Sequence, residues 1–169
     1  MRIRAAHTGD LKAIMAVLEA AKGIMRADGN AGQWVNGYPS EEVILKDIES
    51  NYGFIAEEID GRTVAYFAFI PSPEPTYNYI EGGFWLNEAP YHVVHRIGSY
   101  PEVHGVFRAI MDWCFSKDPN IRIDTHKDNH IMQHCIVGYG FTYCGIIYLA
   151  SGDQRLAYQK TARWRVERL

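Results

Sequence analysis

The sequence lacks several features that would assign it to a specialised class of protein. Its longest apolar run, from Val64 to Ile70, is strand-sized and far short of the roughly 18 residues of a membrane helix. The first ten residues, MRIRAAHTGD, contain no apolar segment of the kind found in signal peptides. Basic residues are not in surplus, because 17 Lys and Arg stand against 20 Asp and Glu. These absences argue against a membrane protein, a secreted protein and a general nucleic-acid binder.

Cysteine is scarce and its spacing is unpaired. Three cysteines leave an odd one, which predicts buried thiols in a reducing cytoplasm rather than disulfides. The chain also has no internal repeat, low-complexity tract or linker that would divide it. With 169 residues, 47% of them hydrophobic, it is long enough to bury one core. We therefore expect one domain over residues 1–160 and a solvated C-terminal tail over residues 161–169.

Hydrophobic periodicity predicts alternating strands and helices. Strands are expected at 2–6, 52–59, 62–70, 91–99, 121–125, 141–149 and 155–160. Helices are expected to begin at Thr8, Ser40, Pro101 and Asp128. The Asp60-Gly61 pair predicts a two-residue antiparallel hairpin, whereas strand–helix–strand alternation in the second half predicts parallel pairing. Together these patterns predict an α/β (α+β) domain with a mixed central sheet of about seven strands and helices on both faces.

The stretch from Ile97 to Ala109 has the pattern of a strand, a short turn and a helix start. A helix N-terminus presents free N–H groups and a partial positive charge, which together suit a diphosphate. Pro101 and Gly105 would allow close approach of the backbone. The alternative is an ordinary strand-to-helix connection.

The same stretch and the element order resemble the GNAT superfamily of N-acetyltransferases over nearly the whole chain. The family's pyrophosphate loop has the pattern Pro-x-x-Arg/Gln-Gly-x-Gly-x-Gly/Ala. Here Pro101, Gly105 and Ala109 match, His104 stands in place of Arg or Gln, and Phe107 stands in place of a glycine.

Further elements carry the resemblance downstream and upstream of this loop. Asp128-Asn129 before the last predicted helix and Gly140-Phe141 after it are similar to the family's Asn…Gly-Phe element. The stretch from Asp124 to Met132 and the loop from Trp34 to Pro39 resemble signatures of a subgroup.

The resemblance implies acetyl-CoA as co-substrate and a set of residues around it. Main-chain groups of Ile97 and Ser99 would bind the pantetheine arm and the acetyl carbonyl, and Asn129 would reach it across a gap between the fourth and fifth strands. Backbone amides would meet the diphosphate at His104, Gly105, Val106, Phe107, Arg108 and Ala109. The family's tyrosine that protonates the departing thiolate has no counterpart, because that position is Ile136; Tyr139 and Cys135 are nearby substitutes.

Acetyl transfer to an amine needs a group that removes the amine's proton. His95 is one candidate, because a histidine titrates close to neutral pH without any special environment. Glu81 is a second, although a glutamate in this role would need a pKa raised by burial. Each could instead be structural, as a hydrogen-bonded strand histidine or a solvated glutamate.

Several aromatic residues lie in predicted loops rather than on a periodic core face. Trp34, Tyr38 and Trp85 are candidates for walls of the acceptor pocket, along with Tyr77 and Tyr79. The alternative is that they cover an edge of the sheet.

Three other functions are compatible with parts of the sequence. His126, His130 and His134 have a spacing that can bind a metal, but no Cys or carboxylate pattern completes a site, and we expect none. A thiol hydrolase could use Cys135 or Cys114. Because of Phe107 and Ile136, the chain could also be a non-catalytic acyl-CoA-binding protein.

The sequence thus predicts a cytoplasmic N-acetyltransferase that transfers an acetyl group from acetyl-CoA directly to a primary amine. The sequence contains no pattern of an activated nucleophile, so we expect no covalent acetyl-enzyme intermediate. A small molecule or a peptide could be the acceptor, nucleic acid and membrane are not expected as partners, and the protein would be a monomer or homodimer.

Overall fold

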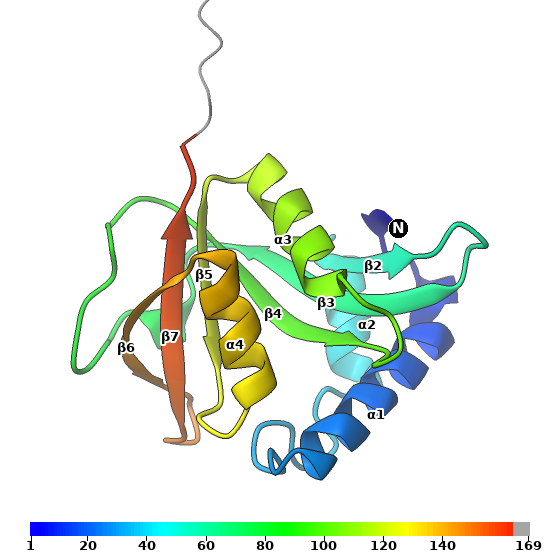
Figure 1. Cartoon of the computed structure of the whole chain (residues 1–169), viewed down its shortest axis with the longest axis horizontal. Helices are drawn as coiled ribbons and strands as arrows, with labels where there is room; N and C mark the ends of the chain where they lie inside the picture. Colours follow the sequence, from blue (N-terminus) through cyan, green and yellow to red (C-terminus); the bar gives the residue numbers. More distant parts are fainter. Residues whose placement is uncertain (164–169) are drawn as a thin grey trace, which may run out of the picture.

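The computed structural model describes residues 1–163 and has one seven-stranded sheet with four α-helices in that range (Figure 1). The strands are β1 (Arg2–Ala5), β2 (Gly53–Glu57), β3 (Thr63–Pro71), β4 (His92–Ser99), β5 (Asn120–Thr125), β6 (Thr142–Tyr148) and β7 (Gln154–Thr161). The helices are α1 (Leu11–Ala27), α2 (Glu41–Glu49), α3 (Val106–Lys117) and α4 (His130–Tyr139), and the 3-10 turns are η1 (Thr8–Asp10) and η2 (Pro75–Tyr77). The predicted fold class is confirmed.

The sheet is mixed, with the strand order β1-β2-β3-β4-β5-β7-β6. Only β4 and β5 pair in parallel, and every other neighbouring pair is antiparallel. The parallel pairing predicted from strand–helix–strand alternation is present between β4 and β5 but not between β5 and β6. The chain folds back after β6, and β7 pairs with both β5 and β6, so that it separates these two strands.

Alternation along the strands gives the sheet an apolar surface on each face. On β3, Tyr66 packs into a cluster with Ile14 and Leu18 of α1 and Ile44 of α2. Its neighbour Phe67 belongs to the larger cluster on the other face, which contains the buried side chains of α3 and Ile136 of α4. Successive strand residues point to opposite faces. As predicted, the helices cover both sides, with α1 and α2 on one and α3 and α4 on the other (Figure 1).

The two parallel strands in the middle of the sheet part soon after they begin. The register between β4 and β5 consists of His92 opposite Ile121 and Val93 opposite Arg122. Within the described residues, β4 has no strand partner on this side from Val94 onward. The gap predicted between these strands is therefore present.

Several predicted element boundaries need correction. The first long helix begins at Leu11 after the turn η1, not at Thr8. Pro101 does not start α3, because the residues from Pro101 to Gly105 form the connection and the helix begins at Val106. Asn129, rather than Asp128, caps α4, and its side-chain oxygen accepts a hydrogen bond from the N–H of Met132 at 3.0 Å.

Two other predicted features of local structure are close to those observed. Ser40 caps α2 as predicted, by accepting a hydrogen bond from the N–H of Val43. The hairpin between β2 and β3 is present, but its turn is longer than two residues: Glu58 N–H bonds to Arg62 O, and Gly61 takes a positive φ of 85°.

At the C-terminal end, β7 continues through Thr161, which lies opposite Asn120 of β5. The rest of the predicted tail, residues 164–169, lies outside the described residues. None of the helices in residues 1–163 has the length and apolar character needed to cross a membrane.

Candidate active site

A bulge in β4 marks the place where this strand separates from β5. Tyr66 pairs with Gly98 and Ala68 pairs with His95, so Arg96 and Ile97 together oppose the single residue Phe67. Arg96 has a φ of 54°, a backbone conformation that is uncommon for a residue other than glycine. Such bulges bend a strand and redirect side chains, and they are frequent next to active sites.

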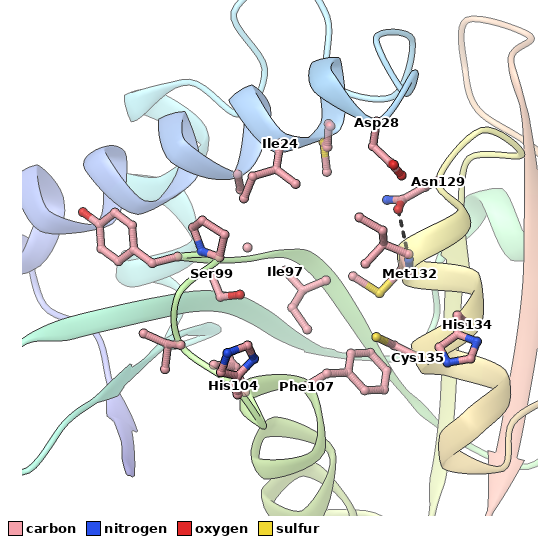
Figure 2. Close-up of a pocket in the computed structure, with 18 of the residues that line it drawn as sticks. Ile24, Asp28, Ile97, Ser99, His104, Phe107, Asn129, Met132, His134 and Cys135 are labelled. Atoms are coloured by element: carbon pink, nitrogen blue, oxygen red, sulfur yellow. Dashed lines mark hydrogen bonds between the residues drawn. The ribbon is translucent and has the colours of Figure 1, made fainter.

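A cavity of about 620 Å³ lies between α1, the start of α3 and α4; we call it the α3–α4 cavity (Figure 2). Eight of the nine residues expected to contact acetyl-CoA line it: Ile97, Ser99, His104, Gly105, Val106, Phe107, Arg108 and Asn129. Ala109 is the exception. Its N–H donates the first hydrogen bond of the helix, to Gly105 O at 3.1 Å, and is therefore not free for a ligand.

The start of α3 presents backbone N–H groups to this cavity. The amides of Val106, Phe107 and Arg108 precede the first helical hydrogen bond, so they have no partner within the helix. Gly105, which caps the helix, has a φ of 76° and no side chain that could occupy these donors. The helix dipole adds a partial positive charge at this end.

Phe107, the departure from the family's glycine pattern, does not cover these amides. Its ring extends from the start of α3 toward Cys135 on α4 (Figure 2). The ring packs against the main core cluster and meets Tyr139 edge-on, with 6.3 Å between ring centroids. The side chain thus forms part of the cavity wall while its amide stays at the helix start.

A second cavity, of about 560 Å³, lies on the opposite side of the bulge; we call it the β4–β7 cavity. The two cavities share four lining residues, which are Met25, Ile97, Asn129 and Met132. Ile97 follows the bulge and Asn129 caps α4, so the shared wall stands where β4 and β5 part. The two cavities therefore border each other at this place.

His95 lies in the β4–β7 cavity between two carboxylates. Its Nε2 is 3.8 Å from Glu74 Oε2 and its Nδ1 is 4.0 Å from Asp124 Oδ2. The interaction with His95 lowers the pKa of Glu74 to about 2. The Tyr77 hydroxyl donates to Asp124 at 2.5 Å, and its burial, together with this carboxylate, raises the pKa of Tyr77 well above its usual value. The carboxylates would stabilise an imidazolium formed when His95 accepts a proton.

The loop after α1 closes the β4–β7 cavity and brings Trp34 and Tyr38 to its wall. Gln33 holds this loop in place. Its side-chain oxygen accepts from the side-chain amides of Asn30 and Asn129, at 2.9 and 2.8 Å. Both aromatic residues therefore form part of the wall of this cavity.

Two predicted site residues lie elsewhere, and the structure corrects their assignment. Glu81 lines neither cavity; its backbone pairs with Ile146 of β6, and its exposed carboxylate accepts a hydrogen bond from Tyr148. Glu81 is therefore not the buried carboxylate that the role of base would need.

Trp85 is likewise absent from both cavities. It is buried in a separate core cluster, where its indole N–H donates to Tyr77 O at 2.9 Å and its ring stacks on the guanidinium of Arg122. Trp85 thus packs in the core and has no place in the wall of either cavity.

At the position of the family's tyrosine that protonates the departing thiolate, this chain has Ile136, which is fully buried in the main core. Of the two substitutes, the Tyr139 hydroxyl donates to Asp112 of α3 at 2.7 Å, and burial raises the pKa of this phenol. Cys135 lines the α3–α4 cavity, and burial raises the pKa of its thiol. Neither is arranged as a ready acid.

The structure gives little support to a metal site or to a thiol hydrolase. Residues 1–163 contain no group of three or more His, Cys, Asp or Glu side chains arranged to hold a metal. Cys114 is fully buried, and this burial raises the pKa of its thiol far above the range of reactive cysteines.

Four residues that the sequence did not single out complete the β4–β7 cavity. Glu74 and Asp124 flank His95, whereas Arg96 and Arg155 bring positive charge. No local pattern identifies them, because they come from β4, β5, β7 and the segment after β3. Of these four residues, only Asp124 belongs to a stretch that carries the family resemblance, which extends from Asp124 to Met132.

Comparison with known proteins agrees with this fold. No protein-family model and no curated protein matches the sequence. Among solved structures, the chain is 32% identical to a GNAT-family acetyltransferase from Streptococcus agalactiae, with a TM-score of 0.88 and 96% of each chain covered. The chain therefore belongs to the GNAT family of acetyltransferases.

More distant structures share the fold alone. A GNAT-family acetyltransferase from Listeria monocytogenes is 19% identical, with a TM-score of 0.69 and coverage of 95% of this chain and 94% of that one. The ribosomal-protein-S18-alanine N-acetyltransferase from Escherichia coli is 15% identical, with a TM-score of 0.62 and coverage of 99% and 97%.

Proposed function

We propose that this protein is an acetyl-CoA-dependent N-acetyltransferase that acetylates a primary amine directly. The observation that carries the proposal is the meeting of two cavities at Ile97 and Asn129, one beside free helix amides and the other containing His95. Family membership supports acetyl transfer in general; the cofactor, the residue roles and the amine acceptor belong to the proposal.

In this proposal acetyl-CoA occupies the α3–α4 cavity and supplies an acetyl thioester. The amides of Val106, Phe107 and Arg108 bind its diphosphate, and the unpaired edge of β4 at Ile97 and Ser99 binds the pantetheine arm. A further observation supports an occupant here. The side-chain oxygen of Asn30, a buried residue of the cavity wall, has no hydrogen-bond partner, so it can accept an N–H from a ligand.

The acceptor occupies the β4–β7 cavity, where His95 takes a proton from its ammonium group. The neutral amine then attacks the thioester carbonyl, a new C–N bond forms, and the C–S bond breaks to release the CoA thiolate. The amine loses its second proton as the tetrahedral intermediate collapses, and the departing thiolate takes this proton through solvent to become the CoA thiol. A backbone N–H near Ile97 would stabilise the oxyanion of that intermediate. The carboxylates of Glu74 and Asp124 stabilise the protonated His95.

A thiol-release assay with acetyl-CoA and a panel of amines tests the proposal. Wild-type protein should release CoA with at least one acceptor, and His95→Ala should lower kcat by about 10²- to 10⁴-fold, the usual contribution of a general base. Glu81→Ala is the matched control. It removes a carboxylate that lies outside both cavities, and activity should be retained.

Calorimetry with acetyl-CoA separates this function from a binding-only protein. Binding without turnover on any amine would favour the non-catalytic alternative, and absence of binding would refute the cofactor assignment. A cytoplasmic location, a small-molecule or peptide acceptor, and a monomeric or homodimeric state stay predictions.

A further inference from the structure

Arg155 of β7 is a buried cation in the wall of the β4–β7 cavity. Only 5% of its surface is exposed. Its guanidinium donates hydrogen bonds to two main-chain carbonyl oxygens, of Gln154 at 2.9 Å and of Gln33 at 3.2 Å. Within residues 1–163 it forms no ion pair.

A charge buried without an ion pair is costly, and proteins seldom keep one without a reason. Asp124 and Asp153 favour the Arg155 cation at longer range, but neither carboxylate forms an ion pair with it. Carbonyl oxygens satisfy N–H groups but carry no net charge, and burial lowers the pKa of Arg155. The nearby carboxylates are engaged elsewhere. Asp124 accepts from Tyr77 and faces His95, and Asp153 accepts from Ser151 at 3.0 Å. An anion that enters the cavity would give Arg155 the ion-pair partner that it lacks among the described residues.

The other two arginines of this region each lack one of the features of Arg155, either the missing ion pair or the position in the cavity wall. Arg96, in the same cavity, is neutralised by both carboxylate oxygens of Asp47. Arg122 lies outside both cavities, between the rings of Trp85 and Tyr91 at 4.0 Å from each centroid. Arg155 therefore combines burial, access to the cavity and the lack of an ion pair within residues 1–163.

The sheet also places Arg155 on the same face as the proposed base. Asp124 of β5 lies opposite Ala157 of β7, so Arg155, two residues from Ala157, shares the face of Asp124. Asp124 in turn adjoins His95 of β4. Along one face, β4, β5 and β7 thus present a proton acceptor, an anion and a cation. An amine could bind at His95 and Glu74 while a carboxylate of the same molecule binds at Arg155.

We propose that the acceptor is an amine that also carries a carboxylate, as amino acids do, and that Arg155 binds this carboxylate. The inference rests on the proposed acetyl transfer and specifies its substrate class. Arginine suits this role because its planar guanidinium can donate two parallel hydrogen bonds to a carboxylate.

The test compares amines that differ only in the carboxylate. Acetyl transfer to the standard amino acids is measured alongside their decarboxylated counterparts, such as lysine with cadaverine and phenylalanine with phenethylamine. We expect kcat/KM to favour the amino acid, and Arg155→Gln to lower it by about 10- to 100-fold through KM. The decarboxylated amine should change far less with this substitution, and Arg155→Lys should restore part of the preference.

A purely structural role of Arg155 predicts a different result. The bond to Gln33 also holds the loop after α1, so a structural arginine would lower activity on both members of each pair equally. Equal losses, or no preference for the carboxylate in wild-type protein, would overturn the inference while leaving acetyl transfer established.

Binding of the reaction products gives a readout that does not need turnover. Thermal denaturation is measured with N-acetylphenylalanine and with N-acetylphenethylamine, in wild type, Arg155→Gln and the exposed control Arg62→Gln. Stabilisation by N-acetylphenylalanine alone, lost in Arg155→Gln and kept in Arg62→Gln, supports the inference even if no amine is acetylated. Equal stabilisation by both compounds, or by neither, argues against it.

Discussion

The guanidinium of Arg96 binds both carboxylate oxygens of Asp47, with Nε 2.8 Å from Oδ2 and Nη2 2.5 Å from Oδ1. Burial alone would lower the pKa of Arg96, but the hydrogen bonds with Asp47 outweigh it, and the pKa is raised. The buried Tyr66 hydroxyl donates to the same carboxylate at 2.6 Å. Because Arg96 belongs to the bulge of β4 and Asp47 to α2, this pair connects the helix layer to the strand residue next to His95 and Ile97.

Removing this carboxylate should strongly destabilise the protein. In Asp47→Ala, Arg96 would keep its buried charge but lose its partner, which typically costs about 3–5 kcal/mol. Urea denaturation measures the loss in free energy of unfolding. Glu49→Ala, an exposed site on the same helix, is the control and should change stability by less than about 0.5 kcal/mol. Similar values for both variants would contradict this account of the bulge.

The left-handed backbone of Gly105 should be needed for cofactor binding. No atom lies within 4 Å of a Cβ added there, so Gly105→Ala introduces no clash, only strain at a φ of 76°. We expect a loss of about 1–2 kcal/mol in stability and weaker binding of acetyl-CoA in calorimetry, because the amides after it would shift.

Gly23→Ala is the matched control for Gly105→Ala. It also has open space around an added Cβ, but it lies within α1 with ordinary helical φ. Alanine should stabilise the protein there by about 0.4–1 kcal/mol and leave acetyl-CoA binding unchanged. A loss of binding in both variants, or in neither, would speak against the role given to the backbone of Gly105.

Glu74 should make stability depend on pH in the acid range. Its pKa in the folded protein is about 2, below the ordinary value of 4.5. The ionised carboxylate therefore stabilises the fold above about pH 4.5, and this contribution disappears as the pH falls toward about 2. Glu74→Gln should lower the free energy of unfolding by about 1–3 kcal/mol at neutral pH, and the difference from wild type should shrink below pH 4.5. Urea denaturation across this pH range is the measurement, and a difference that does not vary with pH would refute it.

Acetyl-CoA should protect Cys135 from alkylation. This half-buried thiol lines the α3–α4 cavity, whereas Cys114 and Cys144 are buried in core clusters. Iodoacetamide at mildly alkaline pH should label Cys135 first in the native protein, since burial raises its pKa but does not close access. Mass spectrometry should then show slower labelling when acetyl-CoA is present. Unchanged labelling at Cys135 would place the cofactor elsewhere.

Features that depend on neighbouring residues in the sequence could be predicted well. Ser40 caps α2 through a residue three positions away, and Gly140 ends α4 in the left-handed conformation expected of a C-terminal glycine. The strand-to-helix stretch from Ile97 to Arg108 likewise forms a cavity wall as the motif indicated. These outcomes need only local backbone preferences, which the sequence contains directly.

The errors concern residues whose surroundings come from distant parts of the chain. Glu81 and Trp85 lie in a segment without regular periodicity. Their positions away from the cavities depend on tertiary contacts, of Glu81 with β6 and of Trp85 with Arg122. His95 was predicted, but its companions Glu74 and Asp124 lie 21 and 29 positions away, in the segment after β3 and in β5, and become its neighbours only in the folded chain.

The sequence by itself determined the strands and helices, the mixed sheet and the helix start with free amides, because alternation, capping and glycine conformation act over a few residues. Only the tertiary structure decided where β4 separates from β5, which acids face His95, and that Arg155 is buried without an ion pair in the part of the chain that the structure describes. Those features arise from contacts between strands far apart in the chain, whose register and burial are set by packing of the whole core.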